Sequence, residues 1–444
     1  MKTKLFVILI LCFQSIFAQD SLKQKWYTLH AQETTVSQYR PMFNAKYTGE
    51  HSQTTEEQWA TTLTSTIFAG VKLWKNAQVI LNPEIAGGSG LSSAFGIAAF
   101  TNGEAFRVGS PEPKIYIARA FFRQLIPLTK EREWQEDGEN KIQQLIPTKY
   151  ISLTAGKVSI ADYFDDNSFS HNPRTQFLSW GLMSNGAWDY PANTRGYTPS
   201  AIIEFVTPKL EIRYAVSMMP VTANGNIMDK NINKANANSF EIKYKYRLMG
   251  QPGKISALAF YNTAFMGSYK AQNIISTPDS LNPIFYTNDY SIVASRQYGR
   301  SKYGFGLNLE QNLTDNVGIF ARASYNDGKN ETWCFTEIDR AFSIGTSIKG
   351  SKWKRKDDVL GFAYCISGLS NEHANYLSKG GLGFIIGDGN LNYSNEHLLE
   401  TYYSASFLNG KIVPSLVYQF ILNPAYNKDR GPINVFSLRL HMSI

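Results

Sequence analysis

Two long stretches of the chain combine arginine, carboxylate, amide and aromatic side chains at short spacing. Residues 82–123 and 174–197 contain Glu84, Asn102, Glu104, Arg107, Arg119, Arg123, Arg174, Trp180, Trp188, Asp189, Tyr190 and Arg195. Guanidinium, carboxylate and amide groups can each form several hydrogen bonds with hydroxyls, while Trp and Tyr rings pack against apolar ring faces. This combination is what a saccharide site needs. The alternative is that the same residues pack and ion-pair two loops into a stable rim.

We predict that the binding residues form a narrow constriction. The predicted set is Glu84, Asn102, Glu104, Arg107, Arg119, Arg123, Trp188, Asp189 and Arg195.

Residues suited to catalysis are thinly spread. The six histidines are isolated and none belongs to an HExxH motif. His171 follows several Asp and Ser residues in the 160–180 segment, but neighbours within one loop rarely form a catalytic triad. The acidic run from Asp162 to Asn167 fits no calcium-loop template, and we expect a solvated loop there. The sequence therefore predicts no enzyme, no metal site and no cofactor.

Composition points to a large β-rich protein. The chain has 444 residues, of which 43% are hydrophobic, 14% aromatic and only 18% charged. Such a chain can bury a large core, which excludes disorder. After the N-terminus, no uncharged apolar run approaches the ~20 residues that a membrane-spanning helix needs. The net charge of +8 is scattered, so we expect no nucleic-acid partner.

The first eighteen residues resemble an export signal. Lys2 and Lys4 precede an apolar stretch at 5–13, and Ala18 is a plausible cleavage point. We predict a signal peptide at 1–18 and one exported domain at 19–444. Only Cys334 and Cys365 remain in that domain, and two unpaired thiols are favoured over a disulfide.

Period-two alternation dominates the exported domain. In 239–248, apolar side chains at every second position alternate with Ser, Glu, Lys and Arg, and similar patterns recur at 210–218 and 303–310. Short connections alternate with long ones, which is typical of a transmembrane barrel with short periplasmic turns and long extracellular loops. We predict an all-β, antiparallel barrel of about 16 strands. The strands should begin near residues 26, 60, 77, 115, 149, 200, 210, 239, 254, 302, 317, 341, 358, 398, 412 and 434.

The alternation also assigns faces. An Arg or Lys that faces lipid at mid-depth costs about 2–4 kcal/mol, so Arg213, Lys243, Lys245 and Arg322 should point into the lumen. In 115–125, the residues Tyr116, Ala118, Ala120 and Phe122 should face outward, which places Arg119 and Arg123 inside. One segment breaks the pattern, because residues 126–148 are long and charged where a short turn is due. A barrel of about 16 strands is wide enough for an aqueous channel.

Several motifs carry a family resemblance across nearly the whole exported domain. They are NPEIAGGSGLSSAFGIAAFTNGEAFRVG (82–109), IYIARAFFRQ (115–124), DDNSFSHNPRTQFLSWGLMSNGAWDYPANTRGYT (165–198), MPVTANG (219–225), FGLNLEQNL (305–313), NDGKNETWCFTEID (326–339), GGLGFIIGDG (380–389), ETYYS (400–404) and NPAYNKDRGP (423–432). Together they resemble the carbohydrate-selective porins, the OprB-like family of Gram-negative outer membranes. The departures are the terminal Ile444, Cys334 and the 126–148 insertion.

The resemblance implies a 16-stranded outer-membrane channel for passive, sugar-preferring diffusion. Its loops would fold into the pore and an arginine-containing constriction would select saccharides, with a general role for Glu84, Arg107 and the Arg119–Arg123 region. The expected partners are mono- or oligosaccharides and outer-membrane lipid, in a monomer or a trimer. A general or anion-selective porin, a barrel enzyme and a barrel without a channel remain alternatives.

Overall fold

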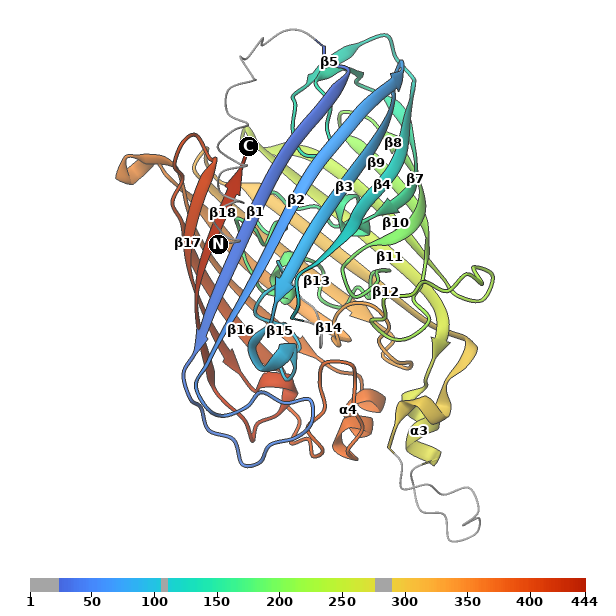
Figure 1. Cartoon of the computed structure of the whole chain (residues 1–444), viewed down its shortest axis with the longest axis vertical. Coiled ribbons are helices and arrows are strands. Elements are labelled where there is room, and N and C mark those ends of the chain that lie inside the picture. Colours follow the sequence, from blue (N-terminus) through green and yellow to red (C-terminus); the bar gives the residue numbers. More distant parts are fainter. Residues whose placement is uncertain (1–23, 105–110, 276–289) are drawn as a thin grey trace.

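The alternating stretches form sixteen antiparallel strands that close into a barrel (Figure 1). The computed structural model describes residues 24–104, 111–275 and 290–444. The barrel strands are β1 (Tyr27–Arg40), β2 (Gln58–Trp74), β3 (Ala77–Gly88), β4 (Lys114–Pro127), β7 (Tyr150–Val158), β8 (Thr198–Val206), β9 (Leu210–Met218), β10 (Asn236–Leu248), β11 (Gln251–Met266), β12 (Gln297–Asn312), β13 (Val317–Asn326), β14 (Arg340–Gly350), β15 (Arg355–Gly368), β16 (Glu396–Ser404), β17 (Ile412–Leu422) and β18 (Ile433–Ser443). Each begins close to its predicted position, so the predicted fold class is confirmed.

The remaining elements are short. They are the hairpin strands β5 (Arg132–Gln135) and β6 (Gln144–Pro147), and the helices α2 (Trp180–Met183), α3 (Tyr269–Ile275) and α4 (Asn371–Ser378). Single 3-10 turns are η2 (Leu91–Ala94), η3 (Ile160–Asp162), η5 (Ile292–Ser295), η6 (Ser351–Trp353) and η7 (Pro424–Tyr426). No helix in the described ranges is long and apolar enough to cross a membrane.

The barrel closes between the two ends of the chain. Strand β1 pairs with β18 in antiparallel register, from Gln32 opposite Ser443 to Tyr39 opposite Phe436. Every other barrel strand pairs with its neighbours in sequence, apart from the hairpin inserted between β4 and β7. Closure leaves no unpaired sheet edge, which is what a β-structure requires inside lipid.

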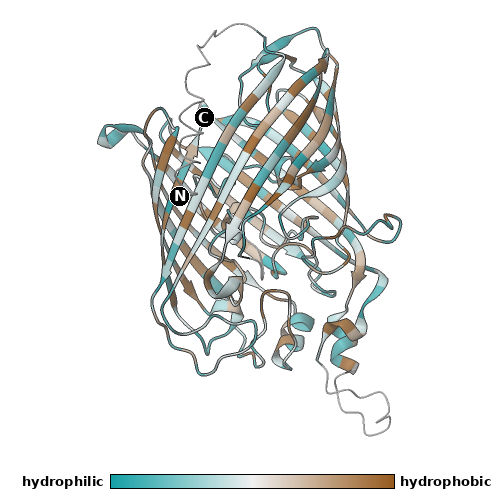
Figure 2. Ribbon diagram, viewed as in Figure 1, coloured by the Kyte–Doolittle hydropathy of each residue, from teal (hydrophilic) through white to brown (hydrophobic). Residues whose placement is uncertain are grey.

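The outer face is apolar and the inner face is polar. On β12, Phe305 and Leu307 are 58% and 55% exposed, whereas the intervening positions are buried or partly buried. Figure 2 shows the resulting alternation of hydrophobic and hydrophilic residues along the strands. Trp59 and Trp74 lie exposed near opposite ends of β2, as in the aromatic girdles of outer-membrane barrels.

The predicted inward basic residues do face the lumen. Arg213 pairs with Glu204 and Glu241, and Arg322 pairs with Asp165 in the loop between β7 and β8. Lys243 is buried, and Lys245 forms an ion pair with Glu211, which neighbours it on β9.

Strand β4 departs from the predicted alternation. Its pairing with β3 shifts between Asn82 and Pro83, so that a bulge separates the two halves of β4. A bulge inserts one residue and reverses the facing of the residues beyond it. The prediction that Tyr116 faces outward is therefore wrong. Ile115 and Ile117 are the outward residues on that half of the strand, at 74% and 40% exposure, while Tyr116 bonds to Glu84 inside.

The long loop between β7 and β8 fills the barrel. Its side chains Phe164, Phe177, Leu178, Leu182 and Trp188 are buried in the main hydrophobic cluster. The expectation of a solvated acidic loop at 162–167 is wrong, because Asp165 is fully buried and paired with Arg322. The sequence pattern missed this placement since the loop buries its charges against partners from distant strands.

The charged 126–148 segment forms the β5–β6 hairpin. The hairpin lies at the short-turn end of the barrel, opposite α3 and α4 (Figure 1). At its tip, Asp137 accepts hydrogen bonds from Lys25 and Thr28, both at 2.8 Å, and lies 3.4 Å from His30. The hairpin is thus attached to the beginning of β1.

Cys334 and Cys365 are unpaired, as predicted, and both are buried. They belong to two different hydrophobic clusters, Cys365 to the main one and Cys334 to a smaller one with Trp333 and Met219.

Candidate functional site

A narrow polar pocket lies between strands β2–β4 and the loop that fills the barrel. Its volume is about 50 Å³, and its walls come from β2, β3, β4, the loop between β3 and β4, and the loop between β7 and β8. The lining residues are Thr64, Glu84, Ala86, Gly87, Gly88, Glu104, Tyr116, Arg174, Arg195 and Tyr197. We call this pocket the constriction pocket.

Two carboxylates and one guanidinium form its centre. Arg174 Nε lies 2.9 Å from Glu104 Oε1, and Arg174 Nη2 lies 3.5 Å from Glu84 Oε2. Glu84 also accepts hydrogen bonds from the hydroxyls of Tyr116 at 2.5 Å and Tyr197 at 3.1 Å. These bonds hold both phenol rings at the edge of the pocket.

Two further arginines stack on the same phenol rings. Arg195 lies over the ring of Tyr116 at 4.2 Å, and Arg119 lies over the ring of Tyr197 at 5.2 Å. Arg119 is fixed by a bidentate ion pair with Asp162, at 2.6 and 2.7 Å. Stacking leaves the planar edge of each guanidinium available for hydrogen bonds.

The pocket retains unused hydrogen-bonding capacity. Within the described ranges, Arg195 Nε, Arg119 Nη1 and Glu104 Oε2 are buried and have no hydrogen-bond partner. Buried polar atoms normally have partners, since leaving one unsatisfied costs about 1–3 kcal/mol. Two donors and one acceptor are therefore available to a polar molecule in or beside the pocket.

The charges of the loop residues follow from their surroundings. Burial opposes the charge of Arg174, but Glu104 and Glu84 outweigh it and raise the pKa of Arg174 above its ordinary value. Burial also raises the pKa of Glu104, although Arg174 and Thr64 oppose that shift. Burial and the Glu84 carboxylate raise the pKa of Tyr197, so its hydroxyl remains a donor. The pocket thus keeps a permanent cation beside neutral hydroxyl groups.

The structure brings together part of the predicted site. Glu84, Glu104 and Arg195 line the constriction pocket, and Arg119 borders it through Tyr197. Asn102 supports it, because its amide donates to Thr62 at 2.9 Å while its oxygen accepts from the Glu104 backbone. Arg123 also faces inward, beside this pocket on β4, and donates a hydrogen bond to the hydroxyl of Tyr163 at 2.7 Å. The predicted residue Arg107 lies outside the described residues.

Two predicted residues lie elsewhere, in the packed interior. Trp188 is 1% exposed and packs against the rings of Phe164 and Tyr190. Asp189 accepts hydrogen bonds from three successive backbone N–H groups, those of residues 333–335. Both residues hold loops together inside the barrel.

Seven lining residues were not in the predicted set, and three of them are the charged or aromatic residues Arg174, Tyr197 and Tyr116. Arg174 belongs to the arginine-rich stretch at 174–197, and the same type-and-spacing signal includes it. Tyr197 closes that stretch, whereas Tyr116 was assigned to the wrong face because the bulge in β4 has no clear sequence signal.

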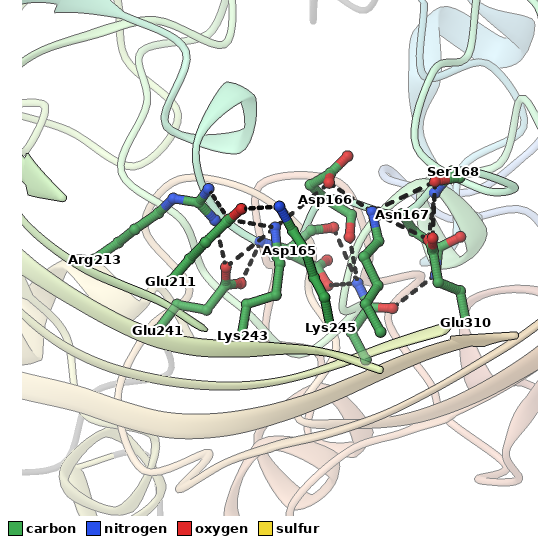
Figure 3. Close-up of polar contacts among 12 residues, drawn as sticks. Asp165, Asp166, Asn167, Ser168, Glu211, Arg213, Glu241, Lys243, Lys245 and Glu310 are labelled. Atoms are coloured by element: carbon green, nitrogen blue, oxygen red, sulfur yellow. Dashed lines mark hydrogen bonds and ion pairs between the residues drawn. The ribbon is translucent and has the colours of Figure 1, made fainter. Parts of the chain in front are cut away.

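A polar network fixes the loop that carries Arg174 and Arg195. Figure 3 shows Asp165, Asp166, Asn167 and Ser168 of this loop directed at charged residues of the barrel wall. Asp166 Oδ2 lies 2.7 Å from Lys254 Nζ, and Ser168 Oγ donates to Glu310 at 2.8 Å. Burial opposes the charge of Asp166, yet Lys243 and Lys254 hold its pKa well below the usual range. The acidic run predicted to be solvated is the anchor of the loop.

The same network includes the Asp and Ser residues of the 160–180 segment that a barrel enzyme could use for catalysis. The hydroxyl of Ser170 donates to the backbone oxygen of Leu182 and accepts from Arg322 Nη1 at 3.1 Å. Asp165 forms an ion pair with Arg322, and Asp166 forms one with Lys254. Among the described residues of this loop, the structure shows no Ser–His hydrogen bond. No cluster of metal-ligating side chains occurs within the described ranges.

Comparison with known proteins identifies the family. Residues 50–444 match the sequence profile described as "Carbohydrate-selective porin, OprB family". The chain belongs to this family. No curated protein matches the sequence. As an OprB-family porin with a closed barrel, the chain is assigned to the outer membrane of Gram-negative bacteria.

Solved structures agree on the fold. The high-pH structure of Pseudomonas putida OprB superimposes with a TM-score of 0.70 at 14% identity, covering 94% of each chain. The outer membrane channel DcaP of Acinetobacter baumannii gives a TM-score of 0.50 at 10% identity, covering 94% of this chain and 97% of that one.

Proposed function

We propose that this OprB-family porin mediates passive, sugar-selective diffusion and that the constriction pocket is its selective element. The observation that carries the proposal is the convergence of Arg174, Arg195 and Glu104 with two inward tyrosines in the narrow pocket. Hydroxyls of a sugar would accept hydrogen bonds from Arg195 Nε and Arg119 Nη1 and donate one to Glu104 Oε2. The apolar face of the sugar ring would pass the phenol rings.

The small pocket sets a condition on passage. A volume of about 50 Å³ holds one or two waters, each of which takes about 30 Å³ in the liquid. A sugar ring must therefore displace a side chain. Arg195 is the candidate, because it is held by stacking on Tyr116 and forms no ion pair among the described residues. Movement of Arg195 costs little, and the sugar would replace the lost contact.

The mechanism needs no energy coupling and no cofactor. Passive diffusion uses a site that is occupied easily and vacated easily, so weak binding by a few hydrogen bonds is sufficient. We further propose that residues 1–18 are a signal peptide removed on export, and that the outward apolar belt contacts lipid.

A substitution of Arg195 tests the proposal. In proteoliposomes, Arg195→Ala should widen the pocket and reduce the uptake of glucose relative to that of an uncharged non-sugar solute of similar size. The control is Arg296→Ala, because Arg296 is also a loop arginine stacked on an aromatic ring, Trp333, at 5.4 Å, and differs from Arg195 in its ion pair with Glu331. Equal loss of sugar preference in both variants, or in neither, would contradict a localised constriction.

A further inference from the structure

A second and much larger cavity lies inside the short-turn end of the barrel. Its volume is about 1070 Å³, and it is bounded by strands β10–β14, by turns at their ends and by the turn between β8 and β9. In porins this end faces the periplasm. We call the cavity the periplasmic vestibule. Ser168 and Phe169 of the loop that fills the barrel lie on its inner side.

Basic side chains dominate the wall of the vestibule. The cations are Lys209, Lys245, Arg247, Lys254 and Lys349, and the carboxylates are Glu310 and Asp315. Lys254 is neutralised by Asp166 and Glu310, at 2.7 and 3.2 Å, and Lys245 by Glu211 at 2.5 Å.

Three cations of the wall keep their charge uncompensated. Within the described ranges, Lys209, Arg247 and Lys349 form no ion pair, and Arg247 donates only to the backbone oxygen of Gly250 at 2.8 Å. All three are exposed to the vestibule or its mouth. Because low-dielectric walls focus the field of one sign of charge, such a cavity raises the local concentration of anions.

An aromatic side chain shares the wall with these cations, because Phe169 of the loop that fills the barrel lines the vestibule. The ring of Phe169 packs over Gly318, where a side chain would collide with it, so the ring is held in place. Phosphate needs several donors that converge on one point, whereas these cations are spread around a wide cavity. Dispersed cations beside the Phe169 ring suit a sugar ring that carries a carboxylate.

We infer that the periplasmic vestibule is a weak exit site for acidic saccharides such as uronic acids. This inference rests on the proposed function, because the sugar reaches the vestibule through the constriction pocket. An acidic sugar that has passed Arg174 and Arg195 would meet a second basic region on its way out. Water fills the vestibule and salt screens charges beyond ~8 Å at physiological ionic strength, so the sugar is attracted without being trapped.

Side-specific block of single channels tests the inference. Sodium glucuronate is added to each side of a bilayer in turn, for the wild type, for the triple variant K209E/R247E/K349E and for the control K75E/K411E. Lys75 and Lys411 are exposed on short turns at the same end but do not line the vestibule. We expect one-sided block of the wild type and the control, and block at least about tenfold weaker in the triple variant. The reversal potential in a KCl gradient should indicate higher cation selectivity in the triple variant than in the wild type or the control.

Two further measurements separate the possible failures. Glucose block is recorded on the same channels, and its absence in the wild type would contradict the proposed function itself. Glucose block in the wild type together with equal glucuronate block in all three proteins would overturn the vestibule site alone. Inorganic phosphate is the third probe, and we expect it to block only at concentrations about tenfold higher than glucuronate. Equal block by phosphate would overturn the assignment to saccharides.

Discussion

Single residues in the lumen show how a porin keeps charged groups inside a barrel. Arg322 and Asp165 are almost completely buried, with side chains 2% and 0% exposed, and lie 3.1 Å apart. Arg322 also donates to the backbone oxygens of Ser170 and Leu182, at 2.6 and 2.9 Å. One guanidinium thus attaches the loop between β7 and β8 to the barrel wall.

Arg322→Ala should therefore destabilise the protein strongly. Breaking a buried pair leaves an uncompensated charge and costs about 3–5 kcal/mol. The control is Arg355→Ala, since Arg355 forms a comparable pair with Asp358 at 2.8 Å but is 41% exposed. We expect the control to cost no more than about 1 kcal/mol. Urea unfolding of the two variants in detergent measures the difference, and similar costs would contradict the anchoring role.

The buried carboxyl group of Glu337 should make the stability of the protein depend on pH. Its carboxylate is buried between extracellular loops and accepts hydrogen bonds from the N–H groups of Ile385 and Ile386, at 2.8 and 3.1 Å. Burial raises the pKa of Glu337 from 4.5 to about 8, against those bonds. The folded state holds the proton more tightly than the unfolded state, so stability falls as the pH rises from about 4.5 to about 8.

Glu337→Gln should remove this dependence, because the amide oxygen can still accept both bonds while carrying no charge. Thermal unfolding at pH 5, 7 and 9 measures it, with Glu133→Gln on the exposed face of the β5–β6 hairpin as the control. The wild type and the control should lose clearly more stability toward pH 9 than the variant does. An identical pH profile for all three proteins would refute the role assigned to Glu337.

At the scale of elements, the sequence predicts the strands well and the loop positions poorly. Strand alternation has a physical cause that is local, namely lipid on one side and polar lumen on the other. The bulge in β4 depends on its register with β3, and the burial of the loop at 162–167 depends on an ion pair with the distant strand β13, so neighbouring residues reveal neither. For the same reason the sequence does not reveal that Trp188 and Asp189 lie in the packed interior, away from the constriction pocket.

The β5–β6 hairpin provides a test at this scale. Asp137 joins the hairpin tip to Lys25 and Thr28 at the beginning of β1. Asp137→Ala should free the hairpin at a local cost of about 1–3 kcal/mol, while the barrel remains closed. Limited proteolysis from the periplasmic side should then cut within 130–148 faster than in the wild type or in Glu133→Ala. Unchanged cleavage would show that other contacts hold the hairpin.

For the whole molecule, the barrel and its inner loop divide the lumen into two regions. The constriction pocket lies along β2–β4 and is small, rich in arginine and lined by tyrosines. The periplasmic vestibule lies along β10–β14 and is wide and basic. The loop between β7 and β8 contributes to both, through Arg174 and Arg195 on one side and Ser168 and Phe169 on the other. In our proposals, selection and release would use separate parts of this one loop.

The central claim is that the pore contains a site for sugars, and single-channel recording of the purified full-length protein tests it most directly. The current is titrated with glucose, with maltose and with a non-sugar solute of matched size. The proposed site predicts block that saturates with sugar concentration and is absent with the non-sugar solute. An open current that falls equally with every solute would contradict the site and leave a general porin.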